Sequence, residues 1–96
     1  MKNIYLVCYD IADPTRWKVI FKTMKSYGDA VQFSVFRCTL TPEAYVTMKR
    51  DLSEHMHTKE DKLLIADLGP MEGRGEHALV ALGKPIAPVL RGSIIL

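Results

Sequence analysis

The stretch that most constrains this chain is NIYLVCYDIADPTRW, which occupies residues 3–17. Residues 4–9 form a continuous apolar and aromatic run, which is typical of a central strand covered on both faces. Asp13 and Pro14 then mark a helix start, because aspartate caps helix N-termini and proline suits the first helical position. The chain therefore passes from a buried strand into a helix through a short connection that contains two acids, Asp10 and Asp13.

Strand and helix patterns alternate along the rest of the chain. Apolar residues recur at helical spacing after Pro14, and Gly28 is placed to end that helix in a left-handed cap. A second helix start follows at Thr41-Pro42, as a plain cap rather than a capping box. After the first strand (3–11), the predicted segments are a helix (14–27), a strand region (29–40), a second helix (from 42), a loop (57–61), a strand (62–68), an exposed loop (69–77) and two short apolar runs (78–82 and 93–96).

This order predicts an α+β fold, a ferredoxin-like βαββαβ sandwich with an extra short C-terminal strand, as one domain over residues 1–96. The region 29–40 must then contain two strands, with a bend near Phe33-Ser34. Both helices would cover one face of the sheet and leave the other face free. Because that face is free and apolar segments are left over at the C-terminus, we expect a partner to cover them, in a homodimer. The helix residues expected in the core are Trp17, Ile20, Phe21, Met24, Tyr45, Met48, Leu52 and Met56.

Composition places the chain among ordinary globular proteins. Its 96 residues are 48% hydrophobic and 25% charged, which suits one domain with one core. No apolar run approaches the roughly 20 residues that span a bilayer, and no signal peptide is recognisable, so we expect a cytoplasmic protein without a membrane partner. Residues 1–50 hold eight Lys and Arg against four Asp and Glu, and this modestly basic half is compatible with a polyanionic partner.

Asp10 allows two interpretations at this point. It follows a central strand, where a carboxylate can simply let the chain leave the core. If two chains stack sheet to sheet about a twofold axis, however, two copies of Asp10 can approach each other. Facing carboxylates repel unless a proton or a hard cation lies between them, and Mg²⁺ is typically bound through one or two carboxylates. Asp13, by contrast, is explained by its cap.

The first predicted helix carries a basic stripe. Lys18, Lys22 and Lys25 are spaced by four and three residues and so share one solvent-facing side, with Arg16 at the N-terminal end. The stripe either follows a phosphate backbone or is an ordinary solvated helix face. No zinc-ligand spacing, phosphate-binding glycine loop or Ser-His-Asp arrangement is recognisable in the sequence.

Several blocks of the sequence resemble the small CRISPR-associated adaptation protein family Cas2. These blocks are YLVCYDI, a basic helix ending in SYG, VQFSVFRC, and ALGKP near the C-terminus, and they extend over nearly the whole chain. The resemblance implies a ferredoxin-like fold and a twofold dimer. It also implies a C-terminal docking segment, residues 79–96, that packs across the partner subunit or against the CRISPR integrase, Cas1.

The resemblance further implies an activity. Cas2 proteins are described as metal-dependent endonucleases acting on single-stranded RNA or double-stranded DNA, and as the bridge of the complex that acquires spacers in antiviral defence. Asp10 matches their strand-end aspartate, whose two copies hold one divalent cation, so it would be both catalytic residue and ligand of Mg²⁺ or an ion such as Mn²⁺. The alternative is a non-catalytic adaptor that bridges integrase subunits and binds duplex DNA.

Other positions of the family pattern are occupied as well. Arg16 and Lys18 match basic positions early in the first helix. The residues expected to bind nucleic acid are Arg16, Lys18, Lys22, Lys25 and Arg37. The residues that match positions lining the dimer groove are Tyr9, Gln32, Ser34 and Phe36. Arg37 stands where the family often has an acid, and it adds positive charge near the groove.

Overall fold

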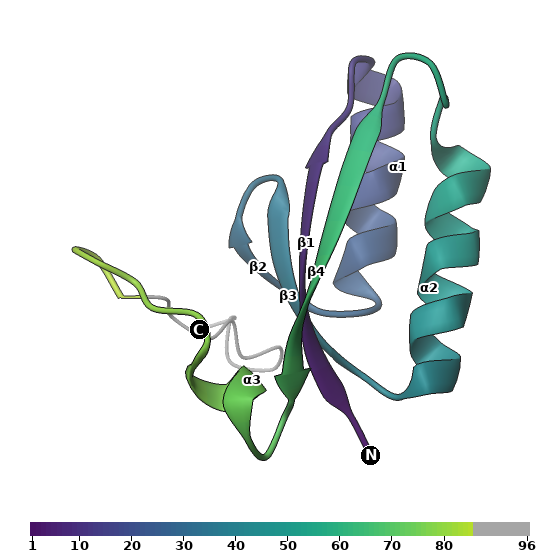
Figure 1. Cartoon of the computed structure of the whole chain (residues 1–96). Coiled ribbons are helices and arrows are strands. Elements are labelled where there is room, and N and C mark those ends of the chain that lie inside the picture. The colour runs from purple at the N-terminus through teal and green to yellow at the C-terminus, as the bar shows by residue number, and fades with distance from the viewer. Residues whose placement is uncertain (86–96) are drawn as a thin grey trace.

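The computed structural model describes residues 1–85, and the strand expected around 93–96 lies outside them. A four-stranded antiparallel sheet carries two helices on one face (Figure 1). None of the helices described is long and apolar enough to cross a bilayer. The elements are β1 (Asn3–Asp10), α1 (Pro14–Lys25), β2 (Asp29–Gln32), β3 (Val35–Leu40), α2 (Pro42–His55), β4 (Lys62–Pro70) and the short α3 (Arg74–His77).

The strand order is β2-β3-β1-β4, so β1 lies inside the sheet between β3 and β4. Cys8 of β1 pairs with Val35 on one side and with Leu64 on the other. This arrangement is that of a ferredoxin-like βαββαβ sandwich, and it confirms the predicted fold class. The region 29–40 does contain two strands, and Phe33-Ser34 separates them as the sequence predicted.

Both helices begin where the sequence predicted and for the predicted reason. Asp13 has an extended backbone, and its carboxylate accepts a 2.9 Å hydrogen bond from the Arg16 amide, with Pro14 starting α1. Thr41 caps α2 in the same way, through the Ala44 amide at 3.1 Å. These caps satisfy amides that have no partner within their own helix.

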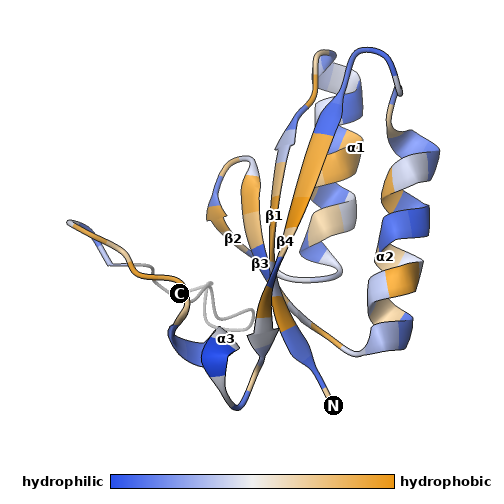
Figure 2. Cartoon of the chain, in the orientation of Figure 1, coloured by the Kyte–Doolittle hydropathy of each residue, from blue (hydrophilic) through white to orange (hydrophobic). Residues whose placement is uncertain are grey.

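The core lies between the sheet and the two helices, and the predicted helix stripes form it. Figure 2 shows apolar segments along both helices and the central strands. The side chains with less than 2% exposure are Val7, Ile20, Met24, Phe36, Cys38, Met48 and Leu52. The partly buried residues Trp17, Phe21, Tyr45 and Met56 pack against this cluster.

The opposite face of the sheet is covered less well within residues 1–85. Along β1, Tyr5, Val7 and Tyr9 are buried, while the residues between them are only partly buried. Leu64 on the neighbouring β4 is 61% exposed. The sequence predicted a strand covered on both faces, and the helices cover only one of them. The predicted homodimer stays a prediction, and this exposed apolar face favours it.

Gly28 does not have the predicted left-handed conformation. Helix α1 ends at Lys25, with Ser26 as its C-cap in the right-handed region, and Gly28 has no positive φ. The glycine is needed for a different reason. A Cβ at Gly28 would lie 2.5 Å from both the Arg37 carbonyl oxygen and the Cys38 Sγ. The connection from α1 to β2 therefore passes too close to β3 for any side chain.

The predicted loop over residues 69–77 is wrong in part. Strand β4 continues to Pro70, and α3 follows from Arg74. Gly69 has a φ of +104°, which suits glycine. Gly75 is buried against it, because a Cβ there would lie 2.5 Å from the Gly69 carbonyl oxygen. The apolar run 78–82 forms no strand, and the rest of the predicted docking segment (79–96) is described only as far as residue 85.

Candidate functional site

Asp10 is the last residue of β1 and lies opposite Lys62 of β4 in the strand pair. It is exposed at the end of the sheet. Within residues 1–85 its carboxylate takes part in no hydrogen bond or ion pair. The structure therefore places the predicted metal ligand where its oxygens remain accessible to a partner outside this part of the chain.

A second acid near the start of α1 is held from three sides. Asp61 accepts hydrogen bonds from the amides of Ala12 at 2.9 Å and His57 at 2.8 Å, and it pairs with Arg16 Nε at 2.9 Å. Its side chain has no exposed surface. Asp61 therefore ties three segments together: the residues that follow Asp10, the first turn of α1, and the loop before β4.

Arg16 is engaged by two acids of that loop. Besides Asp61, its guanidinium contacts a Glu60 carboxylate oxygen at 3.0 Å, and its side chain is only 27% exposed. The hydrogen bond from Arg16, reinforced by the two amides, holds the pKa of the Asp61 carboxyl well below its usual range, although burial opposes this. The nucleic-acid role of Arg16 stays a prediction, and a phosphate would have to compete with both carboxylates.

Lys18, Lys22 and Lys25 are exposed on α1, as their spacing predicted. Within residues 1–85 none of their ammonium groups forms an ion pair. The Lys25 Nζ lies 5.3 Å from the centroid of the Phe21 ring, in a cation–π contact. These three residues, called the lysine stripe below, present unneutralised positive charge to solvent, and their binding to nucleic acid stays a prediction.

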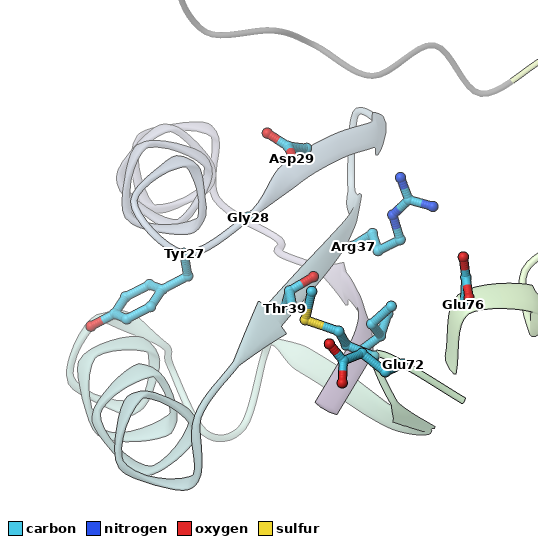
Figure 3. A pocket seen from close by; sticks show the side chains of 9 residues that line it. Tyr27, Gly28, Asp29, Arg37, Thr39, Glu72 and Glu76 are labelled. Atoms are coloured by element: carbon cyan, nitrogen blue, oxygen red, sulfur yellow. The ribbon is translucent and has the colours of Figure 1, made fainter. Parts of the chain in front are cut away.

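Arg37 does not belong to that surface. Its neighbours Phe36 and Cys38 face the core, so Arg37 lies on the face of the sheet away from the helices. It lines a hollow of about 600 Å³ whose other polar lining includes three carboxylates, from Asp29, Glu72 and Glu76 (Figure 3). Three acids around one guanidinium disfavour a phosphate there. Because Arg37 lies on the sheet face away from the helices, it is separated from the lysine stripe on α1. Its predicted contact with nucleic acid stays a prediction.

The four residues expected to line the dimer groove fall into two groups. Tyr9 is 6% exposed and Phe36 is 0% exposed, because both belong to the core beneath the helices. Phe36 therefore has no surface left with which to line a groove. Burial raises the pKa of the Tyr9 hydroxyl to about 12. Gln32 is exposed and Ser34 is partly buried, so these two remain available for the predicted role.

The metal site predicted from the sequence is incomplete in one chain. Within residues 1–85, no group of three or more His, Cys, Asp or Glu residues is arranged to hold a metal ion. The Asp10 carboxylate offers hard oxygen donors, which suit Mg²⁺ and Mn²⁺, and such ions keep several waters and need few protein ligands. The donor chemistry therefore suits a divalent cation, and the predicted site shared by two copies of Asp10 stays a prediction.

Sequence reasoning missed two features of this end of the molecule. Glu60 and Asp61 were assigned only to a polar loop, because nothing local shows which cation an acid will meet. Phe33 was recognised as a bend but not as an exposed aromatic ring, although it is 81% exposed. A large aromatic residue inside a predicted turn was the available signal.

Comparison with known proteins connects this geometry to a family. Residues 3–72 match the family described as CRISPR associated protein Cas2. The chain is 41% identical over 95 residues to the CRISPR-associated endoribonuclease Cas2 1 of Rhodospirillum rubrum, a match that covers 99% of this chain and 92% of that protein. It is 38% identical to the CRISPR-associated endoribonuclease Cas2 of Geobacter sulfurreducens, over 99% of both chains.

Solved structures share the fold. A hypothetical protein from Thermus thermophilus superposes with a TM-score of 0.75 at 33% identity, over 92% of this chain and 99% of that one. The crystal structure of Streptococcus pyogenes Cas2 at pH 6.5 gives a TM-score of 0.70 at 28% identity, over 83% of this chain and 99% of that one. The likeness therefore includes most of the sheet and both long helices.

Proposed function

Because this chain belongs to the Cas2 family of CRISPR-associated proteins, we propose that it is a metal-dependent endonuclease of the CRISPR adaptation machinery. It hydrolyses phosphodiester bonds in single-stranded RNA, double-stranded DNA or both, and it takes part in spacer acquisition in antiviral defence. Two relatives at 41% and 38% identity carry the name endoribonuclease. The observation that carries the proposal is the exposed Asp10 carboxylate at the end of β1, without a partner in residues 1–85.

Asp10 works as a pair in a homodimer. Two Asp10 carboxylates, one from each chain, would hold one Mg²⁺ or Mn²⁺ ion, which would offset their mutual repulsion. The chemistry that a bound ion would supply is polarisation of the phosphodiester and a lower pKa for an attacking water. Within each chain, pairing with β3 and β4 holds β1, and Asp61 holds the Ala12 amide two residues beyond Asp10. The lysine stripe on α1 contributes positive charge for the phosphates of the bound strand.

The distribution of acids also favours a second candidate function, the non-catalytic adaptor. Asp13 is occupied by its cap and Asp61 by Arg16, so neither is free to act as a general base beside Asp10. A dimer that binds duplex DNA through its lysines and docks the Cas1 integrase needs no such base. In that case Asp10 is dispensable for spacer acquisition.

Replacement of Asp10 by Asn separates the two functions, because it removes the charge while keeping the size of the side chain. Metal-dependent cleavage of RNA and DNA is measured beside spacer acquisition with the integrase. Glu54→Gln, which neutralises an exposed acid on α2, is the matched control. We expect Asp10→Asn to abolish cleavage and the control to retain it. Cleavage at the wild-type rate would refute the catalytic role, and lost cleavage with intact acquisition would favour the adaptor.

A further inference from the structure

Phe33 differs from every other aromatic side chain of this protein. The other seven lie in the core or pack against it, whereas Phe33 is 81% exposed in the turn between β2 and β3. An aromatic ring in water forgoes the favourable free energy that burial would provide. A single exposed apolar residue is common in proteins, so the surroundings of Phe33 decide whether the exposure has a function.

Those surroundings form a small apolar site with a polar border. The residues that line this open hollow of about 560 Å³ are Phe21, Ala30, Val31, Gln32 and Phe33. At its border, the Lys25 ammonium lies 5.3 Å from the centroid of the Phe21 ring, so the hollow adjoins the lysine stripe. The exposed Gln32 adds an amide that can donate and accept hydrogen bonds. Aromatic rings beside a cation and an amide match a nucleobase that is attached to a phosphate.

The turn that presents Phe33 is anchored by three hydrogen bonds. The Tyr9 hydroxyl donates to the Phe33 carbonyl oxygen at 3.1 Å, and the Tyr9 amide donates to the Ser34 carbonyl oxygen at 3.1 Å. The Trp17 Nε1 donates to the Ser34 Oγ at 3.2 Å. Because Tyr9 directly precedes Asp10, this turn is tied to the strand end that carries the proposed metal ligand. The ring is therefore presented by a fixed backbone beside the proposed cleavage site, and little order has to be gained on binding.

We propose that Phe33 is a stacking platform for one unpaired base of a single-stranded nucleic acid, with the phosphate next to that base facing Lys25. This inference rests on the proposed nuclease function and specifies single strands as the class that this site recognises. Inside a duplex the bases stack on one another, so a continuous duplex offers no base face to Phe33. A second copy of the chain is the competing occupant of this apolar site, and the cation and amide at its border favour the nucleotide.

The test measures binding by the full chain without divalent metal, so that no cleavage interferes. The probes are a short single-stranded RNA containing 2-aminopurine and a duplex of the same sequence whose two ends are closed by non-nucleotide linkers, so that it contains no unpaired base. Phe33→Ala removes the ring, Phe33→Leu keeps apolar bulk without a π-face, and Phe33→Trp keeps the π-face. Val46→Ala, which truncates a 59% exposed apolar residue on α2, is the matched control.

We expect Phe33→Ala and Phe33→Leu to weaken single-strand binding about tenfold. Duplex binding should stay the same, Phe33→Trp and Val46→Ala should bind the single strand as the wild type does, and only proteins with an aromatic ring should quench 2-aminopurine. Equal weakening for both probes, or wild-type affinity in Phe33→Ala or Phe33→Leu, would overturn the stacking role. Unchanged binding with a shifted monomer–dimer equilibrium in Phe33→Ala would assign the site to a second copy of the chain.

The failure of this inference and the failure of the proposed function give different results. If Asp10 is not catalytic, Asp10→Asn cleaves as the wild type does, and the effect of Phe33→Ala on single-strand affinity is unaltered. If Phe33 does not stack, its variants bind as the wild type does, while Asp10→Asn still loses cleavage.

Discussion

Two aspartates near the start of α1 differ in almost everything except their charge. The Asp61 side chain has no exposed surface and is held by two amides and the Arg16 guanidinium. Asp10 is exposed and has no hydrogen bond or ion pair within residues 1–85. An acid with all its partners inside the chain stabilises the fold, whereas an acid without partners is available to a metal ion, a substrate or a second chain.

Two phenylalanines of the VQFSVFRC block show the same contrast between a residue with partners inside the chain and one without. Phe36 is fully buried and contacts the rings of Tyr9 and Phe21, with centroids 6.3 and 5.4 Å away. Phe33, three residues earlier, is 81% exposed. Residue type alone therefore does not show which member of a pair is structural and which is available for binding. The partners supplied by the fold do, and the predictions below test this distinction.

The largest effect is expected for the two phenylalanines. Phe36→Ala should cost about 3–5 kcal/mol of unfolding free energy, because it leaves a cavity between the sheet and α1. Phe33→Ala should change the stability by about 0.5 kcal/mol or less, since the ring is already in water. Urea denaturation of both variants measures the difference. Similar losses of unfolding free energy in the two variants would contradict the distinction between a buried Phe36 and an exposed Phe33.

The two aspartates should differ in thermal stability. Asp61→Asn removes the negative charge that Arg16 and two amides bind, and we expect a melting temperature lower by about 5–10 °C. Asp10→Asn should shift it by no more than about 2 °C, because no partner in residues 1–85 is lost. Calorimetry at neutral pH makes the measurement. A comparable fall in Asp10→Asn would mean that Asp10 is part of the scaffold.

The pH dependence of stability further tests the difference between Asp61 and Asp10. Because the folded protein holds the pKa of Asp61 below its usual value, its contribution is present above about pH 4 and is lost as the pH falls below that point. The stability difference between wild type and Asp61→Asn should therefore shrink on acidification below about pH 4. Denaturation curves over this pH range measure the difference in stability. A difference that does not change with pH would exclude the ion pair with Arg16 as its cause.

The smallest effect concerns the lysine stripe. Lys18→Glu with Lys22→Glu should weaken duplex binding about tenfold at low salt and reduce its salt dependence by about one unit per lost phosphate contact. Lys49→Glu with Arg50→Glu on α2 makes the same charge change elsewhere and should have less effect. Anisotropy titrations at several salt concentrations test both. Equal losses of duplex affinity in the two double variants would mean that the lysine stripe acts only through the net charge of the protein.

Features that depend on neighbours in sequence were predictable. Asp13 and Thr41 cap their helices through amides three residues ahead, so both starts could be placed from the sequence. The spacing of Ile20 and Met24 likewise placed the buried side of α1, because helix geometry relates residues one turn apart. The turn at Phe33-Ser34 followed from the need for two strands in a short region.

Features that depend on distant segments were not predictable. Gly28 was expected to be a helix cap, and its actual role comes from the backbone of β3 passing 2.5 Å from where its Cβ would lie. Arg16 was expected on the basic surface, but it meets Asp61, 45 residues away in sequence. Phe36 was expected in a groove and is buried instead. In each case the deciding atom belongs to a segment whose position no local pattern specifies.

The sequence by itself determined the order of the elements, both helix starts, the buried helix faces and the position of Asp10 at the end of a central strand. These follow from short-range geometry and from the free energy of burying apolar side chains. Only the tertiary structure decided which charges are neutralised and which aromatic ring remains in water. A charge or a ring acquires its surroundings when segments far apart in the chain meet, and that meeting leaves Asp10 and Phe33 unpartnered within residues 1–85.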